Sequence, residues 1–183
     1  NGADIINISL GSVNGYIGYS ENLNSAIEYA NNRDVVIVAA AGNGDIESSN
    51  LYGVQTGMDL DFYNISPVNN DAKGYYSVLG VGAIDKLGYR TYWSNYGNGV
   101  EIYAPGVDIT STVVPLYSDG YGYSSLLNGT SFSAPMVSAA AALLKSYTTY
   151  SSKEIVDRLI EKSKKGVLDI RAALEGIPND KIR

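Results

Sequence analysis

The chain has 183 residues, a net charge of −6 and 45% hydrophobic residues. This length suits one domain with its own core, and no apolar run reaches about 18 residues, so no membrane-spanning helix is expected. Lysines and arginines number only 13. They offer no basic surface for a phosphate backbone, and nucleic acid is not an expected partner. Cysteine is absent, which excludes disulfides, thiol catalysis and thiolate metal sites, and histidine is absent as well.

Two short apolar runs begin the predicted sheet. Residues 4–9 (DIINIS) and 34–41 (DVVIVAAA) predict buried strands. The segment between them predicts a helix that Ser20 could cap. The apolar face of this helix consists of Leu23, Ile27 and Ala30. A strand, a helix and a strand in succession form a βαβ unit, so the two strands should be parallel with a right-handed crossover.

Residues 44–77 interrupt this pattern. They are rich in Gly, Asn, Asp and Ser and have few periodic apolar positions, which predicts a long functional loop or an insertion. Their acidic residues are Asp45, Glu47, Asp59, Asp61 and Asp71. These carboxylates could form a pocket for a basic side chain or a structural calcium site. A solvated loop face is the favoured explanation for them, and no metal is assigned.

Extended segments and then helices complete the chain. Strands or extended segments are expected at 78–84, 100–105 and 108–114, with a weaker signal in the Tyr, Gly and Ser ribbon of 117–127. Residues 131–148 are apolar nearly all round and predict a buried helix.

Two further helices are expected after this one. Ser151 and Glu154 match a capping box, and a short last helix is expected at 171–175. The apolar stripe behind the capping box consists of Ile155, Val156, Leu159 and Ile160. The expected fold class is α/β, a mostly parallel sheet with helices on both faces, in one domain that spans residues 1–183.

The segment GTSFSAP, residues 129–135, places a serine at a predicted helix start. A helix that begins at or just after Ser131 would put Pro135 in its first turn, and Gly129 would let the backbone approach a ligand closely. The N–H of Ser131 would then point out of the helix toward a developing anion. Equally, Ser131 or Ser133 could be an ordinary helix cap.

GTSFSAP is preceded by two other distinctive segments, ADIINISLG at 3–11 and AAAGN at 39–43. In the same chain order, the three segments resemble the substrate-binding strand, the strand end with the oxyanion-hole asparagine and the serine motif of the subtilisin-like serine peptidases. Shorter matches are VLGVGAID at 78–85, SNYG at 94–97 and YAPG at 103–106. The resemblance covers nearly the whole chain outside the long loop.

The resemblance implies a subtilisin-like three-layer fold, incomplete at its N-terminal side, and a serine endopeptidase that works through an acyl-enzyme and requires no cofactor. Ser131 is then the nucleophile, and its N–H forms an oxyanion hole with the side-chain amide of Asn43. Substrate-binding residues are expected at Ser9, Leu10, Gly11, Ala40, Ala41, Gly42, Gly129 and Thr130. Taken alone, Asn43 would be an ordinary strand-end turn residue, and residues 9–11 a strand end with a glycine turn.

The base that would activate the serine is not evident in the sequence. A serine hydroxyl needs an adjacent base at neutral pH, and Lys145 would lie roughly 21 Å along the helix from Ser131. In the subtilisin-like family the Asp and His precede the serine and lie before the segment that residues 3–11 resemble. We therefore expect the Asp and the His in an N-terminal segment upstream of this chain. Without that segment, this chain should be inactive. Without that segment, residues 4–9 should expose a sheet edge and favour self-association.

Partners and alternatives follow from the same resemblance. A peptide or protein is the expected substrate, and the 16 tyrosines with many Asn, Gly and Ser suggest a secreted or cell-surface protein. Sedolisin-like peptidases have a similar fold and use Ser, Glu and Asp, but they carry Asp where this chain has Asn43. A catalytically inactive scaffold that binds peptides or a partner subunit is the other alternative. No glycine-rich phosphate motif follows a strand, which disfavours a nucleotide-binding domain.

Overall fold

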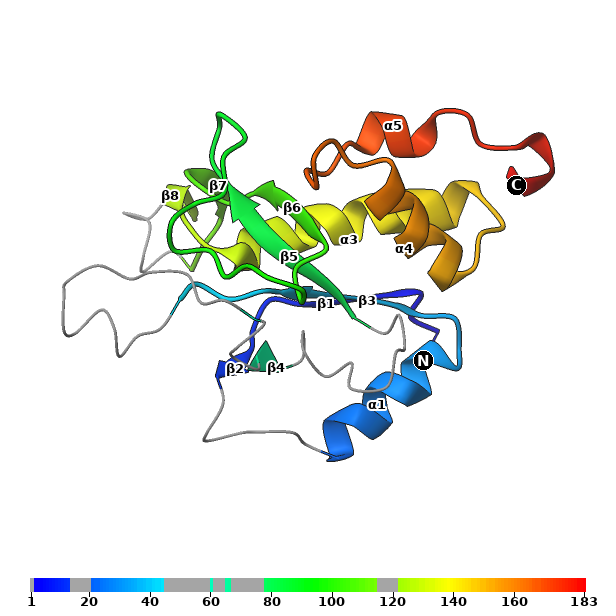
Figure 1. The fold of residues 1–183 in the computed structure, drawn as a ribbon, viewed down its shortest axis with the longest axis horizontal. Helices are drawn as coiled ribbons and strands as arrows, with labels where there is room; N and C mark the ends of the chain where they lie inside the picture. The colour runs from blue at the N-terminus through cyan, green and yellow to red at the C-terminus, as the bar shows by residue number, and fades with distance from the viewer. Residues whose placement is uncertain (1, 14–20, 45–59, 61–64, 67–77, 115–121) are drawn as a thin grey trace.

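The structure is a computed structural model that describes residues 2–13, 21–44, 60, 65–66, 78–114 and 122–183. A parallel sheet with the strand order β1-β3-β5-β6 lies between two layers of helices (Figure 1). Its strands are β1 (Ile5–Ile8), β3 (Val36–Ala40), β5 (Leu79–Ile84) and β6 (Ile102–Pro105). The predicted α/β class with a mostly parallel sheet is confirmed.

The two inner strands, β3 and β5, form the centre of the core. Every residue in both strands is buried, as expected for a parallel sheet that is covered on both faces. β1 places Ile5 opposite Val36 and Ile8 opposite Ala39 in the parallel register. Within the described part of the chain β1 pairs only with β3, so self-association through its other edge stays a prediction.

Helices cover both faces of the sheet (Figure 1). α1 (Glu21–Asn31) covers one face of the sheet. It buries the predicted residues Ile27 and Ala30, and Leu23 packs beside them. On the opposite face lie α3 (Thr130–Tyr147), α4 (Ser152–Glu161) and α5 (Ile170–Leu174). None of the described helices is both long and apolar enough to cross a membrane.

The start of α3 lies at the edge of the sheet where the parallel strands end. β1 and β3 run toward the left in Figure 1, and α3 begins on that side and runs back across the sheet. In open parallel sheets, ligands bind beyond the carboxyl ends of the strands. The fold therefore brings the three sequence motifs to the edge where a binding site is expected.

Two antiparallel pairs were not predicted as pairs. β2 (Ser12–Val13) pairs with β4 (Ile65–Ser66), and β7 (Ile109–Thr112) pairs with β8 (Tyr123–Leu127) through an irregular register. Strands of two residues are too short to carry a period-two pattern, so their sequence predicts nothing. The candidate cap Ser20 and the five acidic residues of the long loop lie outside the described residues.

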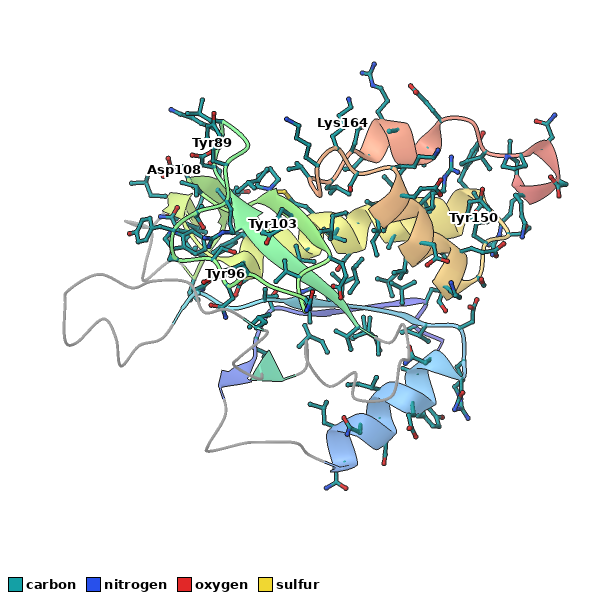
Figure 2. The ribbon with its side chains drawn as sticks, in the orientation of Figure 1. Tyr89, Tyr96, Tyr103, Asp108, Tyr150 and Lys164 are labelled. Carbon is teal, nitrogen blue, oxygen red and sulfur yellow. The ribbon has the colours of Figure 1, made fainter. Side chains whose placement is uncertain are left out.

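The predicted capping box at the start of α4 is confirmed. The hydroxyl of Ser151 accepts a hydrogen bond from the Glu154 N–H, and the Glu154 carboxylate accepts one from the Ser151 N–H at 2.8 Å. Lys181 also donates to Glu154, at 2.6 Å, and so ties α4 to the 3-10 helix Asn179–Lys181. Figure 2 shows Tyr150 at this junction, where its ring lies under the Lys181 ammonium.

Substituting Glu154→Gln is expected to remove an acid-sensitive part of the stability. The hydrogen bond from Lys181, with that from the Ser151 N–H, lowers the pKa of Glu154 from 4.5 to about 2. Because the folded-state pKa lies below the unfolded one, this stabilisation is complete above about pH 4.5 and is lost as the pH falls through about 2. The Glu154 side chain is 42% exposed, and solvent screening limits the expected cost to about 1 kcal/mol at pH 7. In urea unfolding, the free energy of unfolding should differ less between wild type and variant at pH 2 than at pH 7. Equal differences at the two pH values would contradict this assignment.

Candidate active site

Ser131 lies in the first turn of α3. The helix begins at Thr130, and its N-cap residue, Gly129, makes no side-chain capping bond. The Ser131 hydroxyl donates to the carbonyl oxygen of Ser9 at 3.1 Å, and the Ser133 hydroxyl donates to that of Pro105 at 3.1 Å. Neither serine is therefore the helix cap, and both hydroxyls face the ends of strands or the segments that follow them.

Pro135 lies in the second turn of α3, so its expected place in the first turn is wrong. The helix begins earlier than predicted because Gly129 stands in the N-cap position. Proline has no N–H, and the Ser131 carbonyl therefore lacks its usual helical partner four residues later. The Ser9 hydroxyl donates to that carbonyl at 2.8 Å instead. Together with the bond from Ser131 to Ser9, it ties the end of β1 to the start of α3.

Asn43 lies directly beyond the carboxyl end of β3. Its Oδ1 accepts two hydrogen bonds of 2.9 Å from Thr130, one from the backbone N–H and one from the hydroxyl. The same hydroxyl oxygen accepts from the Gly42 N–H at 3.0 Å, and Thr130 is fully buried. These contacts hold the oxygen of the carboxamide against Thr130 and leave its NH₂ group to face the start of the helix.

The Asn43 amide nitrogen and the Ser131 backbone nitrogen border one small space. A β-carbon built on Gly129 would lie 3.2 Å from Asn43 Nδ2 and 3.7 Å from Ser131 N. A side chain at residue 129 would occupy this space, and the φ of +150° at Gly129 also favours glycine. N–H donors held in advance around one point stabilise an oxygen as it gains negative charge.

The segment after β1 borders the same region. β1 ends at Ile8, so residues 9–11 follow the strand and do not extend it. Leu10 is 73% exposed, and Gly11 is exposed as well. Their backbone is in a place where an extended peptide could pair with it, and that role stays a prediction.

Ala40 and Ala41 lie beneath the site. Both side chains are buried in the core, and Ala41 also uses its backbone N–H, which donates to Val81, and its carbonyl, which accepts from Asn95. They support the turn that carries Asn43 from within the protein. Their contact with a substrate side chain stays a prediction.

Lys145 is engaged far from the candidate nucleophile, at the other end of α3. Its ammonium donates to the Asp34 carboxylate at 2.5 Å. Burial raises the pKa of Asp34, but hydrogen bonds from Lys145 and from the Ser152 N–H lower it by more. This ion pair agrees with the exclusion of Lys145 as the base. Among the described residues, no cluster of three or more carboxylates could hold a metal ion.

Asn95 is a buried residue of the site that the sequence did not single out. It belongs to the SNYG segment and is 1% exposed. Its side chain bonds to the backbone of Ala41 and of Gly44, on either side of Asn43. A lone asparagine in a loop gives no local signal of burial, so only the match at 94–97 could have drawn attention to it.

Comparisons with known proteins identify the relatives of this chain. The family model described as the subtilase family matches residues 1–177. A thermostable alkaline protease of Halalkalibacterium halodurans is 38% identical over 160 residues, which cover 87% of this chain and 36% of that protein. Subtilisin DY of Bacillus licheniformis is 34% identical over 186 residues, which cover 96% of this chain and 58% of the subtilisin.

Solved structures show the same likeness in three dimensions. A protease of Pseudoalteromonas arctica matches with a TM-score of 0.73 and 27% identity, over 94% of this chain and 50% of that one. The chain thus spans from 36% to 58% of the length of these relatives. The family model covers almost every residue, and on that ground the chain belongs to the subtilase family.

Proposed function

We propose that the protein containing this chain is a serine endopeptidase, with Ser131 as its nucleophile. The observation that carries the proposal is the space beside Gly129, which the amide of Asn43 and the N–H of Ser131 border together. A nucleophile placed next to two such donors suits acyl transfer, in which negative charge develops on the carbonyl oxygen.

The proposed reaction has two stages. In the first, the Ser131 hydroxyl gives its proton to a base as its oxygen attacks the carbonyl carbon of the peptide bond, and the carbonyl oxygen becomes an oxyanion beside Asn43 and the Ser131 N–H. The oxyanion then collapses, the C–N bond breaks, and the leaving amine takes the proton from the base. In the second stage, water gives a proton to the base as it attacks the acyl carbon, the bond to the Ser131 oxygen breaks, and that oxygen takes the proton from the base as the acid leaves. No step requires a cofactor.

The proposed base is a histidine, oriented by an aspartate, in sequence upstream of this chain. The absence of histidine from all 183 residues supports this proposal, as does the partial coverage of the relatives. The Ser131 hydroxyl donates to the Ser9 carbonyl. It would have to turn from that oxygen to the histidine before it could act. Asn43, where sedolisin-like enzymes carry Asp, speaks against the Ser-Glu-Asp alternative.

The proposed substrate is an extended peptide or protein segment. Leu10 and Gly11 are exposed directly after β1, which supports pairing of this segment with the main chain of a peptide. A secreted or cell-surface location suits the composition rich in Tyr, Asn, Gly and Ser. Structural calcium remains unassigned.

A fluorophosphonate probe tests the proposal because it bonds covalently to an activated serine hydroxyl. The complete protein should be labelled at Ser131, as peptide mass spectrometry would show, and the same protein unfolded in urea should not. The isolated chain of 183 residues should be labelled poorly. No labelling of the complete protein would favour the inactive peptide-binding scaffold. Full labelling of the isolated chain would favour a base within it, as in the sedolisin-like alternative.

A further inference from the structure

We propose that Asn95 is a positioning residue that holds the oxyanion donor Asn43 in place. The inference rests on the proposed function, because it assigns Asn95 a role through Asn43. Asn95 bonds to the backbone on both sides of Asn43, so its effect on catalysis would pass through the turn that carries Asn43.

Hydrogen bonds from Asn95 bracket Asn43 on both sides. Its Nδ2 donates to the Ala41 carbonyl at 2.7 Å, and its Oδ1 accepts from the Gly44 N–H at 2.9 Å. Its backbone N–H also donates to the Gly42 carbonyl at 3.1 Å. One buried residue therefore fixes the backbone immediately before and after Asn43.

The contact with Gly42 is closely packed. Gly42 has a φ of +99°, and a β-carbon there would lie 2.5 Å from Asn95 Nδ2. The amide nitrogen of Asn95 thus occupies the space that a side chain at Gly42 would need. An asparagine is suited to this place because its NH₂ group donates to a carbonyl while its oxygen accepts from an N–H.

Asn95 is itself anchored to the central sheet. The Ser94 hydroxyl donates to the Asn95 carbonyl at 3.1 Å and accepts from the Ala83 N–H of β5 at 3.0 Å. Arg90 donates to the Ser94 carbonyl at 2.6 Å. The turn with Asn43 is therefore held from β5 through Asn95, while Thr130 holds the Asn43 side chain from α3.

The test substitutes Asn95→Asp in the complete protein. An aspartate keeps the shape and the acceptor toward Gly44, but an ionised carboxylate would face the Ala41 carbonyl oxygen and repel it. The turn should shift, and kcat should fall roughly 10- to 100-fold because a small misplacement of a catalytic group is costly. KM should rise by a smaller factor than kcat falls, because Asn95 bonds to Ala41 and Gly42 while the other expected substrate-binding residues, 9–11 and 129–130, belong to separate segments. Asn95→Ser, which adds no charge, should lower kcat in the same direction.

A double-mutant cycle separates positioning from general destabilisation. In an Asn43→Ala background the donor is gone, so Asn95→Asp should lower kcat no further than about twofold. When Asn43 is present, the ratio of the kcat of the Asn95→Asp variant to that of the wild type should rise as the pH falls. The reason is that the introduced carboxyl, once protonated, can donate to the Ala41 carbonyl. Thr148→Val removes a buried hydroxyl bond at the far end of α3 and serves as the control. It should lower the thermal midpoint without changing kcat.

The outcomes distinguish this inference from the proposed function. If the wild-type protein neither turns over a peptide substrate nor reacts with the fluorophosphonate probe, the proposed function fails. Two results with an active wild type would overturn the positioning role. Either Asn95→Asp lowers kcat by the same factor with and without Asn43, or it does not lower kcat at all. A cost confined to the background that retains Asn43 supports the positioning role.

Discussion

Replacing Ser131 by alanine is expected to lower the kcat of the complete protein by about a million-fold, the scale known for loss of the nucleophile in a subtilisin. The proposed acyl-enzyme forms on the Ser131 oxygen alone, so the variant retains only what the oxyanion donors and substrate binding contribute. Burst kinetics and steady-state turnover of a peptide ester would measure the loss. The Ser131 hydroxyl makes one described hydrogen bond, to Ser9, so the fold should be kept.

Ser133 provides a matched control two positions along the same helix. Its hydroxyl is buried and donates to the Pro105 carbonyl. Ser133→Ala should cost about 1 kcal/mol of stability from the lost hydrogen bond and leave kcat within a few-fold of wild type. Comparable losses in both variants, or more than about 1% residual activity in Ser131→Ala, would contradict the assignment of Ser131 as the nucleophile.

Replacing Asn43 by alanine should lower kcat by about 10²- to 10³-fold with little change in KM. The figure is the one known for an oxyanion-hole asparagine in a subtilisin, and we carry it over to this relative. The physical reason is that the hydrogen bond from the Asn43 carboxamide NH₂ to the substrate carbonyl oxygen becomes strong only when that oxygen becomes an oxyanion. An interaction made mainly in the transition state changes kcat and not substrate binding.

Inhibitors would separate this role from structural support. A peptide aldehyde, which forms a tetrahedral adduct on the serine, should bind the Asn43→Ala variant more weakly by a similar factor, whereas a product peptide should bind both proteins equally. The buried Thr130 N–H and hydroxyl also lose their acceptor, which should lower stability by about 1–3 kcal/mol. A variant with raised KM and unchanged kcat would be evidence against an oxyanion role.

Much of the fold was predictable because its signals are local. The buried strands at 34–41 and 78–84, the apolar face of α1 and the capping box at Ser151 each depend on residues within a few positions of one another. Each was found within one or two residues of its predicted place. The short strands β2 and β4 gave no comparable signal, since two residues cannot show a period and their pairing joins distant segments.

The candidate site was predictable in its members and not in its arrangement. The motifs around Ser131 and Asn43 are contiguous stretches, so they can be recognised without coordinates. Pro135 was placed one turn too early because the helix start depends on Gly129, whose role as N-cap is evident only from its backbone geometry. Asn95 went unnoticed because its burial depends on the turn it supports.

The sequence by itself determined the parallel α/β class and the main helices, and it singled out Ser131 and Asn43 as candidates, because periodicity, caps and motifs are properties of neighbouring residues. Only the tertiary structure decided that Asn43 and Ser131 border the same space at Gly129, and that Asn95 lies against the turn that carries Asn43. The contacts of Asn95 with Ala41, of Thr130 with Asn43 and of Ser131 with Ser9 join residues 54, 87 and 122 positions apart. Such residues meet only when the strands pair and α3 packs across the sheet, and no local pattern carries that information.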